Sequence, residues 1–126
     1  MGRIVLVEGD EVVRRTLTRY LVRVGHRVRA YSGAREALVE PDLGFTDLLL
    51  LEWVDYAELV VSRMQDCDSP VPVLALVANP ANAPKAAALR VSEVMLKPPT
   101  MAELSQTIDR LLSTPRAGPT NEEAGA

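Results

Sequence analysis

The sequence predicts an α/β fold in which an open, parallel, five-stranded sheet carries helices on both faces. Five segments of strand length are spread along the chain, helical periods lie between them, and the connections are short. With 126 residues, of which 48% are hydrophobic, the chain has the size and composition of one globular domain.

Four of the five predicted strands are short and mainly apolar, and they cover residues 3–8, 48–52, 72–77 and 93–97. Three of them lack the alternation of a half-exposed strand, so we expect strands that are covered on both faces. The segment RVRAY, residues 27–31, alternates instead: Val28 and Ala30 are set against Arg27, Arg29 and Tyr31. This alternation predicts an edge strand.

Helix signals follow the predicted strands. Asp10 is a favourable N-cap for a first helix, and Gly25 supplies its C-terminal stop. The apolar residues at helical spacing in this helix are Val13, Leu17, Tyr20, Leu21 and Val24. A second helix is expected after Ser32, a third over about 55–65, and a fourth, short and rich in alanine, from about Pro84.

The last predicted helix has the clearest signature. Thr100 and Glu103 have the spacing of a capping box, and the buried stripe is formed by Leu104, Ile108, Leu111 and Leu112. The following segment STPRAGPTNEEAGA has no apolar periodicity, so it is predicted to be disordered. We therefore place one domain at residues 1–113 and a tail at residues 114–126.

Composition argues against several classes of protein. No apolar run approaches the roughly 20 residues that cross a bilayer, and acids follow the N-terminus too early for a signal peptide, so we expect a cytoplasmic location without membrane contact. Cys67 is the single cysteine and is interpreted as an exposed or half-buried thiol, and His26 is interpreted as a strand-entry residue. Without a glycine-rich phosphate loop or a nucleophile paired with histidine, we expect no enzyme.

Charge is unevenly distributed. The net charge is −3, yet the first 35 residues hold eight arginines against three acids. Arg15, Arg19 and Arg23 recur at helical spacing on the face opposite Leu17 and Leu21. A solvated helix face is the simplest interpretation, and an acidic protein partner is the functional one. Nucleic acid is not expected, because no DNA-binding module is recognisable.

The carboxyl ends of parallel strands meet at one edge of a sheet, where functional residues gather. The residues that the sequence places there are Glu8, Gly9, Asp10, Glu52, Val77 and Lys97. Glu52 ends a run of four leucines, so a buried strand delivers a carboxylate to the edge where a lysine is also expected.

From residue 3 to about residue 112, the chain resembles the receiver domain of bacterial two-component response regulators. The resemblance rests on ordered motifs: RIVLVEGDEVV, GAREAL, TDLLLLE, PVLALVAN and EVMLKPPTMAEL. It implies a flavodoxin-like (βα)5 fold. In that family two acids after the first strand and an aspartate after the third hold Mg²⁺. The aspartate accepts a phosphoryl group, a lysine contacts it, and a Thr or Ser and an aromatic residue relay the change.

This sequence departs from the family pattern at most of those positions. Glu8 stands at the first acid position, Gly9 at the second, Glu52 at the acceptor, Val77 at the hydroxyl switch, Val94 at the aromatic switch and Lys97 at the lysine. Gly9 supplies no ligand and Asp10 is expected to cap the first helix, so we expect no cofactor, with weak Mg²⁺ binding at Glu8, Asp10 and Glu52 as the alternative.

Glu52 is one methylene longer than aspartate, and a displacement of about 1 Å can cost on the order of 100-fold in a positioned reaction. We therefore expect Glu52 to form a permanent ion pair with Lys97 rather than to accept phosphate. The alternative structure has Glu52 pointing to solvent and Lys97 exposed.

The sequence thus predicts a stand-alone, atypical receiver domain that acts by phosphorylation-independent protein–protein interaction. The alternative is a phosphorelay receiver that accepts a phosphoryl group at Glu52 or at a nearby acid such as Asp55. The resemblance implies a kinase, regulator or output protein as partner and a homodimer through the last strand and the fourth and fifth helices. Candidates on that second surface are Lys85, Arg90, Met95, Gln106 and Arg110. Trp53 is expected to pack under the site.

Overall fold

The structure of the protein is a computed structural model that describes residues 2–40, 43–66 and 70–113. Two sequence-based expectations, the state of the Cys67 thiol and the disorder of the tail from residue 114, lie outside the described residues. Among the described residues, none of the helices combines the length and the apolar character needed to cross a bilayer.

Five parallel strands form one sheet in the order β2-β1-β3-β4-β5. Their bounds are β1 Arg3–Val7, β2 Arg27–Tyr31, β3 Leu48–Glu52, β4 Val73–Val77 and β5 Glu93–Leu96. The flavodoxin-like fold class is therefore confirmed, and β2 lies at an edge of the sheet as its alternating sequence predicts.

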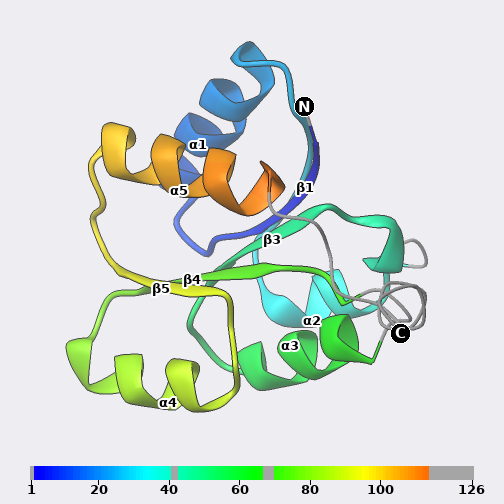
Figure 1. Ribbon diagram of the computed structural model, residues 1–126, viewed down its shortest axis with the longest axis vertical. Coiled ribbons are helices and arrows are strands. Elements are labelled where there is room, and N and C mark those ends of the chain that lie inside the picture. Colours follow the sequence, from blue (N-terminus) through cyan, green and yellow to red (C-terminus); the bar gives the residue numbers. More distant parts are fainter. Residues whose placement is uncertain (1, 41–42, 67–69, 114–126) are drawn as a thin grey trace, which may run out of the picture.

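Helices cover both faces of the sheet. The two longest, α1 (Glu11–Arg23) and α5 (Met101–Ser113), lie on one face, while α2 (Ala34–Leu38), α3 (Ala57–Gln65) and α4 (Ala83–Ala88) lie on the other (Figure 1). Single 3-10 turns occur at Leu43–Phe45 and Pro80–Asn82. Buried apolar residues form cores on both faces of the sheet, one large cluster on each face and a small third cluster around Ala75, Val77 and Ala86.

The four leucines of β3 are buried on both faces of the sheet, which explains why the run has no polar residue. Leu48 and Leu50 pack in the core beneath α1 and α5, whereas Leu49 and Leu51 pack in the core beneath α2 and α3. All four are 0% exposed. Because β3 is the central strand, its residues meet side chains on both faces, and only Glu52 at its carboxyl end reaches the edge.

Local signals set most of the helix ends. The Asp10 carboxylate accepts hydrogen bonds from the backbone N–H groups of Val12 and Val13 at 2.9 and 3.1 Å, so Asp10 is the N-cap of α1. Gly25 follows α1 with a φ of 105°, a backbone conformation that glycine adopts without strain. Val24 is 48% exposed, so its assignment to the apolar stripe is wrong, because it lies beyond the last turn.

Two further expectations concern the ends of elements. The third helix begins at Ala57 rather than near residue 55, because Tyr56 has a left-handed backbone conformation with a φ of 67°. His26 directly precedes β2 and is buried, and its Nδ1 accepts the Gly2 backbone N–H at 3.0 Å. His26 is therefore the strand-entry residue that was predicted.

The capping box of α5 leads to a stability prediction. Thr100 Oγ1 accepts the Glu103 N–H at 3.1 Å, and Glu103 Oε1 accepts the Thr100 N–H at 3.4 Å. Replacing Thr100 with alanine removes the first bond, so we expect the free energy of unfolding to fall by about 1 kcal/mol. Urea denaturation measures this, with Thr16→Ala on the exposed surface of α1 as the control. Equal stabilities of the two variants would contradict the assignment.

Candidate functional site at the carboxyl ends of the strands

Three charged side chains from three strand ends meet in one network. The Lys97 ammonium group donates hydrogen bonds to Glu8 Oε1 and to Glu52 Oε2, each at 2.8 Å. Glu8 follows β1, Glu52 ends β3 and Lys97 follows β5. The expected Glu52–Lys97 ion pair is present, and Glu8 is a second carboxylate on the same ammonium group, a contact that was not predicted from the sequence.

The network is largely withdrawn from solvent. The Glu8 side chain is 0% exposed, while those of Lys97 and Glu52 are 16% and 15% exposed. Burial alone would raise the pKa of Glu52, but hydrogen bonds from Lys97 and from the Gly9 backbone outweigh it and hold the pKa below its ordinary value. Burial likewise opposes the charged form of Lys97, yet its bonds to Glu52 and Glu8 raise the Lys97 pKa.

Gly9 contributes to this network through its backbone. Its N–H donates to Glu52 Oε1 at 2.9 Å, and a Cβ atom at this position would lie only 3.3 Å from the same oxygen. Glycine therefore lets the backbone approach the Glu52 carboxylate closely. From the sequence, Gly9 was interpreted only as a missing ligand. The combination of a longer acid at position 52 with a glycine at position 9 is the signal that could have indicated this contact.

Both carboxylate oxygens of Glu8 and of Glu52, and Oδ1 of Asp10, already accept hydrogen bonds from protein donors. Glu8 accepts from Lys97 and from the Asp10 N–H, Glu52 accepts from Lys97 and the Gly9 N–H, and Asp10 caps α1. A positive ammonium group also lies between the two glutamates. Mg²⁺ requires near-octahedral oxygen coordination, and this donor set in this arrangement does not fit it. No group of three His, Cys, Asp or Glu ligands occurs elsewhere in the described chain.

The two positions of the family's relay are apolar and packed. Val77 is 0% exposed in a cluster with Ala75 and Ala86, and Val94 packs against the same cluster. Neither side chain has a polar atom or a ring. The structure therefore provides no hydroxyl or aromatic group at these positions to respond to a charge at Glu52.

A cleft of about 480 Å³ lies beside Glu52, between the end of β1, the start of α2 and the loop after β3. Asp55 is exposed and lines this cleft, as does Tyr56, whose ring lies 5.5 Å from the Arg35 guanidinium. Trp53 is partly buried and packs against the cores beside it, which agrees with the expected packing role.

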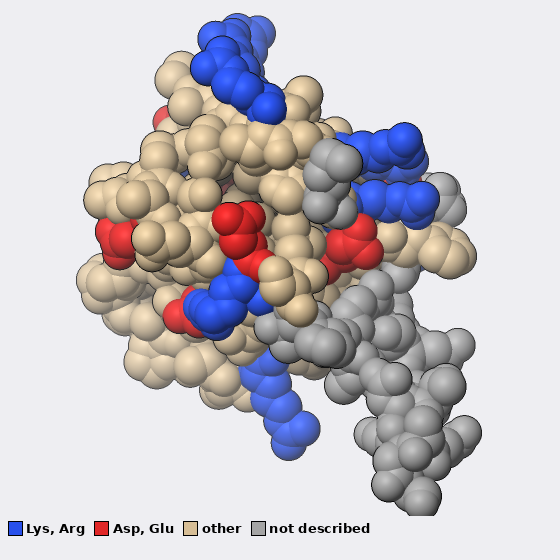
Figure 2. All heavy atoms as spheres, turned by 45° about the horizontal axis from the view of Figure 1, so that its top comes forward, with Lys and Arg blue, Asp and Glu red and all other residues tan. Residues whose placement is uncertain are grey.

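The predicted partner residues are mostly at the surface. Arg15, Arg19, Arg23, Lys85, Arg90, Gln106 and Arg110 are exposed. Arg15 pairs with Glu11 at 3.4 Å and Arg110 with Glu93 at 2.8 Å. Met95 differs, because it is partly buried against the α1–α5 core. On the face drawn in Figure 2, basic side chains stand in separate groups, and acidic side chains lie beside several of them.

The shifted pKa of Glu52 gives a pH prediction. Because its pKa is lower in the folded protein, Glu52 stabilises the fold above its ordinary pKa of 4.5, and this contribution is lost as the pH falls through the lower folded value. The raised Lys97 pKa gives a contribution that is present below 10.5 and lost at higher pH. Wild type should therefore lose more stability between pH 5 and about pH 3 than Glu52→Gln in urea denaturation.

Glu58→Gln, an exposed change on α3 that also removes one carboxylate, is the matched control for this pH series. Its stability should follow that of wild type across the acid range. Parallel curves for wild type and Glu52→Gln would contradict the assigned pKa shift.

Solved structures with the same fold include response regulator receiver domains. The HemR receiver domain from Leptospira biflexa, in a non-phosphorylated form, is 27% identical, with a TM-score of 0.75 over 93% of this chain and 98% of that one. The receiver domain of a signal transduction histidine kinase from Syntrophus aciditrophicus is 20% identical, with a TM-score of 0.78 over 90% and 91%. A response regulator from Thermotoga maritima, solved in complex with Mg²⁺ and BeF, is 21% identical, with a TM-score of 0.74 over 88% and 99%.

The sequence matches no protein-family model and no curated protein. The likeness is thus one of structure at low sequence identity. The chain has the fold of response regulator receiver domains, with an all-parallel five-stranded sheet and helices on both faces.

Proposed function

We propose that residues 1–113 form an atypical receiver domain that acts in a cytoplasmic signalling pathway through phosphorylation-independent binding to another protein. The observation that carries the proposal is the position of the Lys97 ammonium group, 2.8 Å from a carboxylate oxygen of both Glu8 and Glu52. The network holds together the groups that a receiver would use for a metal ion and a phosphoryl group. The proposal gives the domain no catalytic step of its own.

Two physical arguments favour a site that does not accept phosphate. Phosphoryl transfer depends on positioning and on metal neutralisation of the developing charge. Here the Glu8 and Glu52 oxygens already accept bonds from Lys97 and from backbone N–H groups. The side chains at the relay positions, Val77 and Val94, are apolar and have no group that could respond to a charge at Glu52. A signal shifts the equilibrium between two conformations only if it interacts differently with each of them.

The second candidate function is a phosphorelay receiver whose acceptor is Asp55 or Glu52. The exposure of Asp55 in the cleft beside Glu52 favours this alternative, because a phosphodonor can reach its carboxylate. This candidate requires Mg²⁺, whereas the first is indifferent to the ion.

Intact-mass measurement after incubation with acetyl phosphate and Mg²⁺ separates the two functions. The proposal predicts no mass increase for wild type, for Asp55→Asn or for Glu52→Asp. A phosphoryl group on wild type that Asp55→Asn or Glu52→Gln abolishes would overturn it and identify the acceptor. A receiver domain with an intact aspartate acceptor serves as the positive control.

We also propose where the protein partner binds. The exposed Arg15, Arg19 and Arg23 of α1 suit an acidic protein surface, and Lys85, Arg90, Gln106 and Arg110 border the surface formed by α4, β5 and α5. The partner class is a kinase, regulator or output protein, with a second copy of the chain as an alternative on the α4–β5–α5 surface. Sedimentation equilibrium tests the second copy, because a dimer that Arg110→Glu dissociates would support it and a monomer at all concentrations would exclude it.

A further inference from the structure

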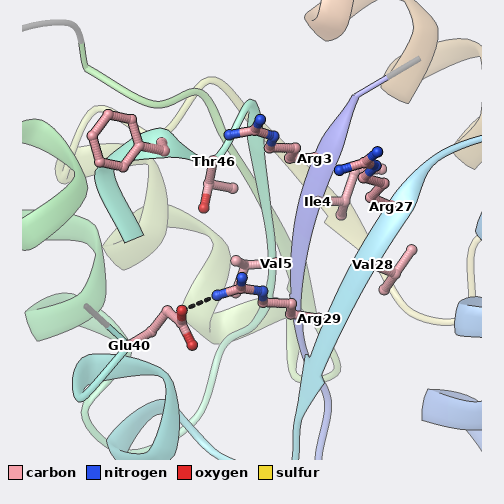
Figure 3. Close-up of a pocket in the computed structure, with 9 residues that line it drawn as sticks. Arg3, Ile4, Val5, Arg27, Val28, Arg29, Glu40 and Thr46 are labelled. Carbon is pink, nitrogen blue, oxygen red and sulfur yellow. Dashed lines mark hydrogen bonds and ion pairs between the residues drawn. The ribbon is translucent and has the colours of Figure 1, made fainter. Parts of the chain in front are cut away.

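A second hollow lies at the opposite ends of the strands from the glutamate–lysine network. Its volume is about 490 Å³, within the range of pockets that hold small molecules. It opens where β1 and β2 begin, at the edge of the sheet (Figure 3). The polar and aromatic residues that line it are Arg3, Arg27, Arg29, Glu40, Phe45 and Thr46.

Strand register brings the three arginines together. Arg3 is the parallel partner of Arg27, and Val5 is the partner of Arg29, so Arg3, Arg27 and Arg29 share one face of the sheet. Their side chains extend to the same side of β1 and β2 in Figure 3. The short helix α2 ends at Leu38, and no helix of the described chain buries these arginines.

Among the described residues that line the hollow, three arginines stand against one acid, Glu40. Glu40 accepts bonds from both Arg29 and the Tyr31 hydroxyl group. Among the described residues, no ion pair joins a carboxylate to the guanidinium group of Arg3 or Arg27. Two guanidinium groups on neighbouring strands repel each other, so an anion bound between them would be attracted by both.

We propose that the hollow binds the diphosphate group of a small molecule, with the guanidinium groups of Arg3 and Arg27 as the clamp. Guanidinium groups match phosphate oxygens with paired, charge-assisted hydrogen bonds. Phe45 lines the same hollow and is 68% exposed, so its ring offers an apolar surface beside the anion. Two kinds of ligand carry this group: free pyrophosphate, and a nucleoside diphosphate whose base would stack on Phe45.

Calorimetric titration of the full chain with pyrophosphate at low salt tests the clamp. We expect saturable binding of one pyrophosphate per chain and a loss of at least about tenfold in affinity in the Arg3→Gln/Arg27→Gln double variant. The matched control is Arg19→Gln/Arg23→Gln, which removes the same charge from exposed α1 positions and should retain the affinity. Absence of saturable binding to wild type, or an equal loss in the control, would overturn the proposal.

Titration with uridine diphosphate distinguishes the two sources. Tighter binding than pyrophosphate, with the difference removed by Phe45→Ala, supports the nucleoside diphosphate. Equal affinity for both ligands supports the inorganic diphosphate. In either case, the affinity of the arginine variants for pyrophosphate decides whether Arg3 and Arg27 form the clamp.

Two further measurements are needed. The first shows whether Arg3 and Arg27 are required for folding, and the second shows whether pyrophosphate binding is independent of the glutamate–lysine network. Without ligand, Arg3→Gln/Arg27→Gln should melt at the same temperature as wild type or higher, because the substitutions relieve like-charge repulsion. A clearly lower melting temperature would show that the arginines hold the fold and would contradict the proposal. Glu52→Gln should leave pyrophosphate affinity unchanged, so either proposal can fail without the other.

Discussion

Replacing Lys97 with methionine is expected to destabilise the folded protein by about 3 kcal/mol, because it leaves two carboxylates without their shared cation. Glu8 is the more severe case, since its side chain has no exposed surface through which water could replace the lysine. Equilibrium urea denaturation near neutral pH measures the effect. Methionine is one heavy atom shorter than lysine but is also unbranched and has a similar volume, so the loss of stability reports mainly on the removed charge.

Two comparisons make the Lys97 result specific. Lys85→Met changes the same residue type at an exposed position of α4 and should alter stability by no more than about 0.5 kcal/mol. Adding Glu8→Gln and Glu52→Gln to Lys97→Met should recover much of the loss, because no uncompensated charge then remains. If Lys97→Met were as stable as Lys85→Met, the three groups would not form a network in solution.

Leu50→Ala is the other substitution with a large expected effect. Leu50 is 0% exposed on the central strand and packs with Leu17 and Ile108 in the core beneath α1 and α5. Truncation leaves a cavity between the sheet and two helices, so we expect a loss of about 3 kcal/mol. Chemical denaturation measures it against Leu59→Ala, whose leucine is 49% exposed on α3. Similar losses at the two positions would contradict the assigned core.

The fold could be predicted from sequence because each local signal agreed with the global arrangement. Apolar runs of strand length alternated with helical periods, and Asp10, Gly25 and Thr100 marked helix ends that the structure places within a residue or two. The third helix start was less accurate, since no sequence signal indicated a left-handed conformation at Tyr56. Val24 was misassigned because periodicity alone does not show where the last turn stops.

The site was predictable in part. Strand ends in a parallel sheet converge, so the pairing of Glu52 with Lys97 followed from topology. The burial of Glu8 and its bond to the same lysine did not follow, because they depend on side-chain conformations that the sequence pattern does not specify. The arginine hollow also escaped sequence reasoning, since the pairing of Arg3 with Arg27 requires the strand register and the early end of α2.

The most direct test of the central claim is a titration of the ¹⁵N-labelled protein with Mg²⁺ and beryllofluoride, followed through backbone amide resonances. The amides of Gly9, Glu52 and Lys97 are the reporters, because all three residues belong to or contact the network. If the Lys97 ammonium group holds both glutamates, these resonances will show no saturable shift. A saturable shift centred on Glu52 and Lys97 would show that the site takes up a metal ion and a phosphoryl mimic, and would contradict a receiver domain that works without phosphorylation.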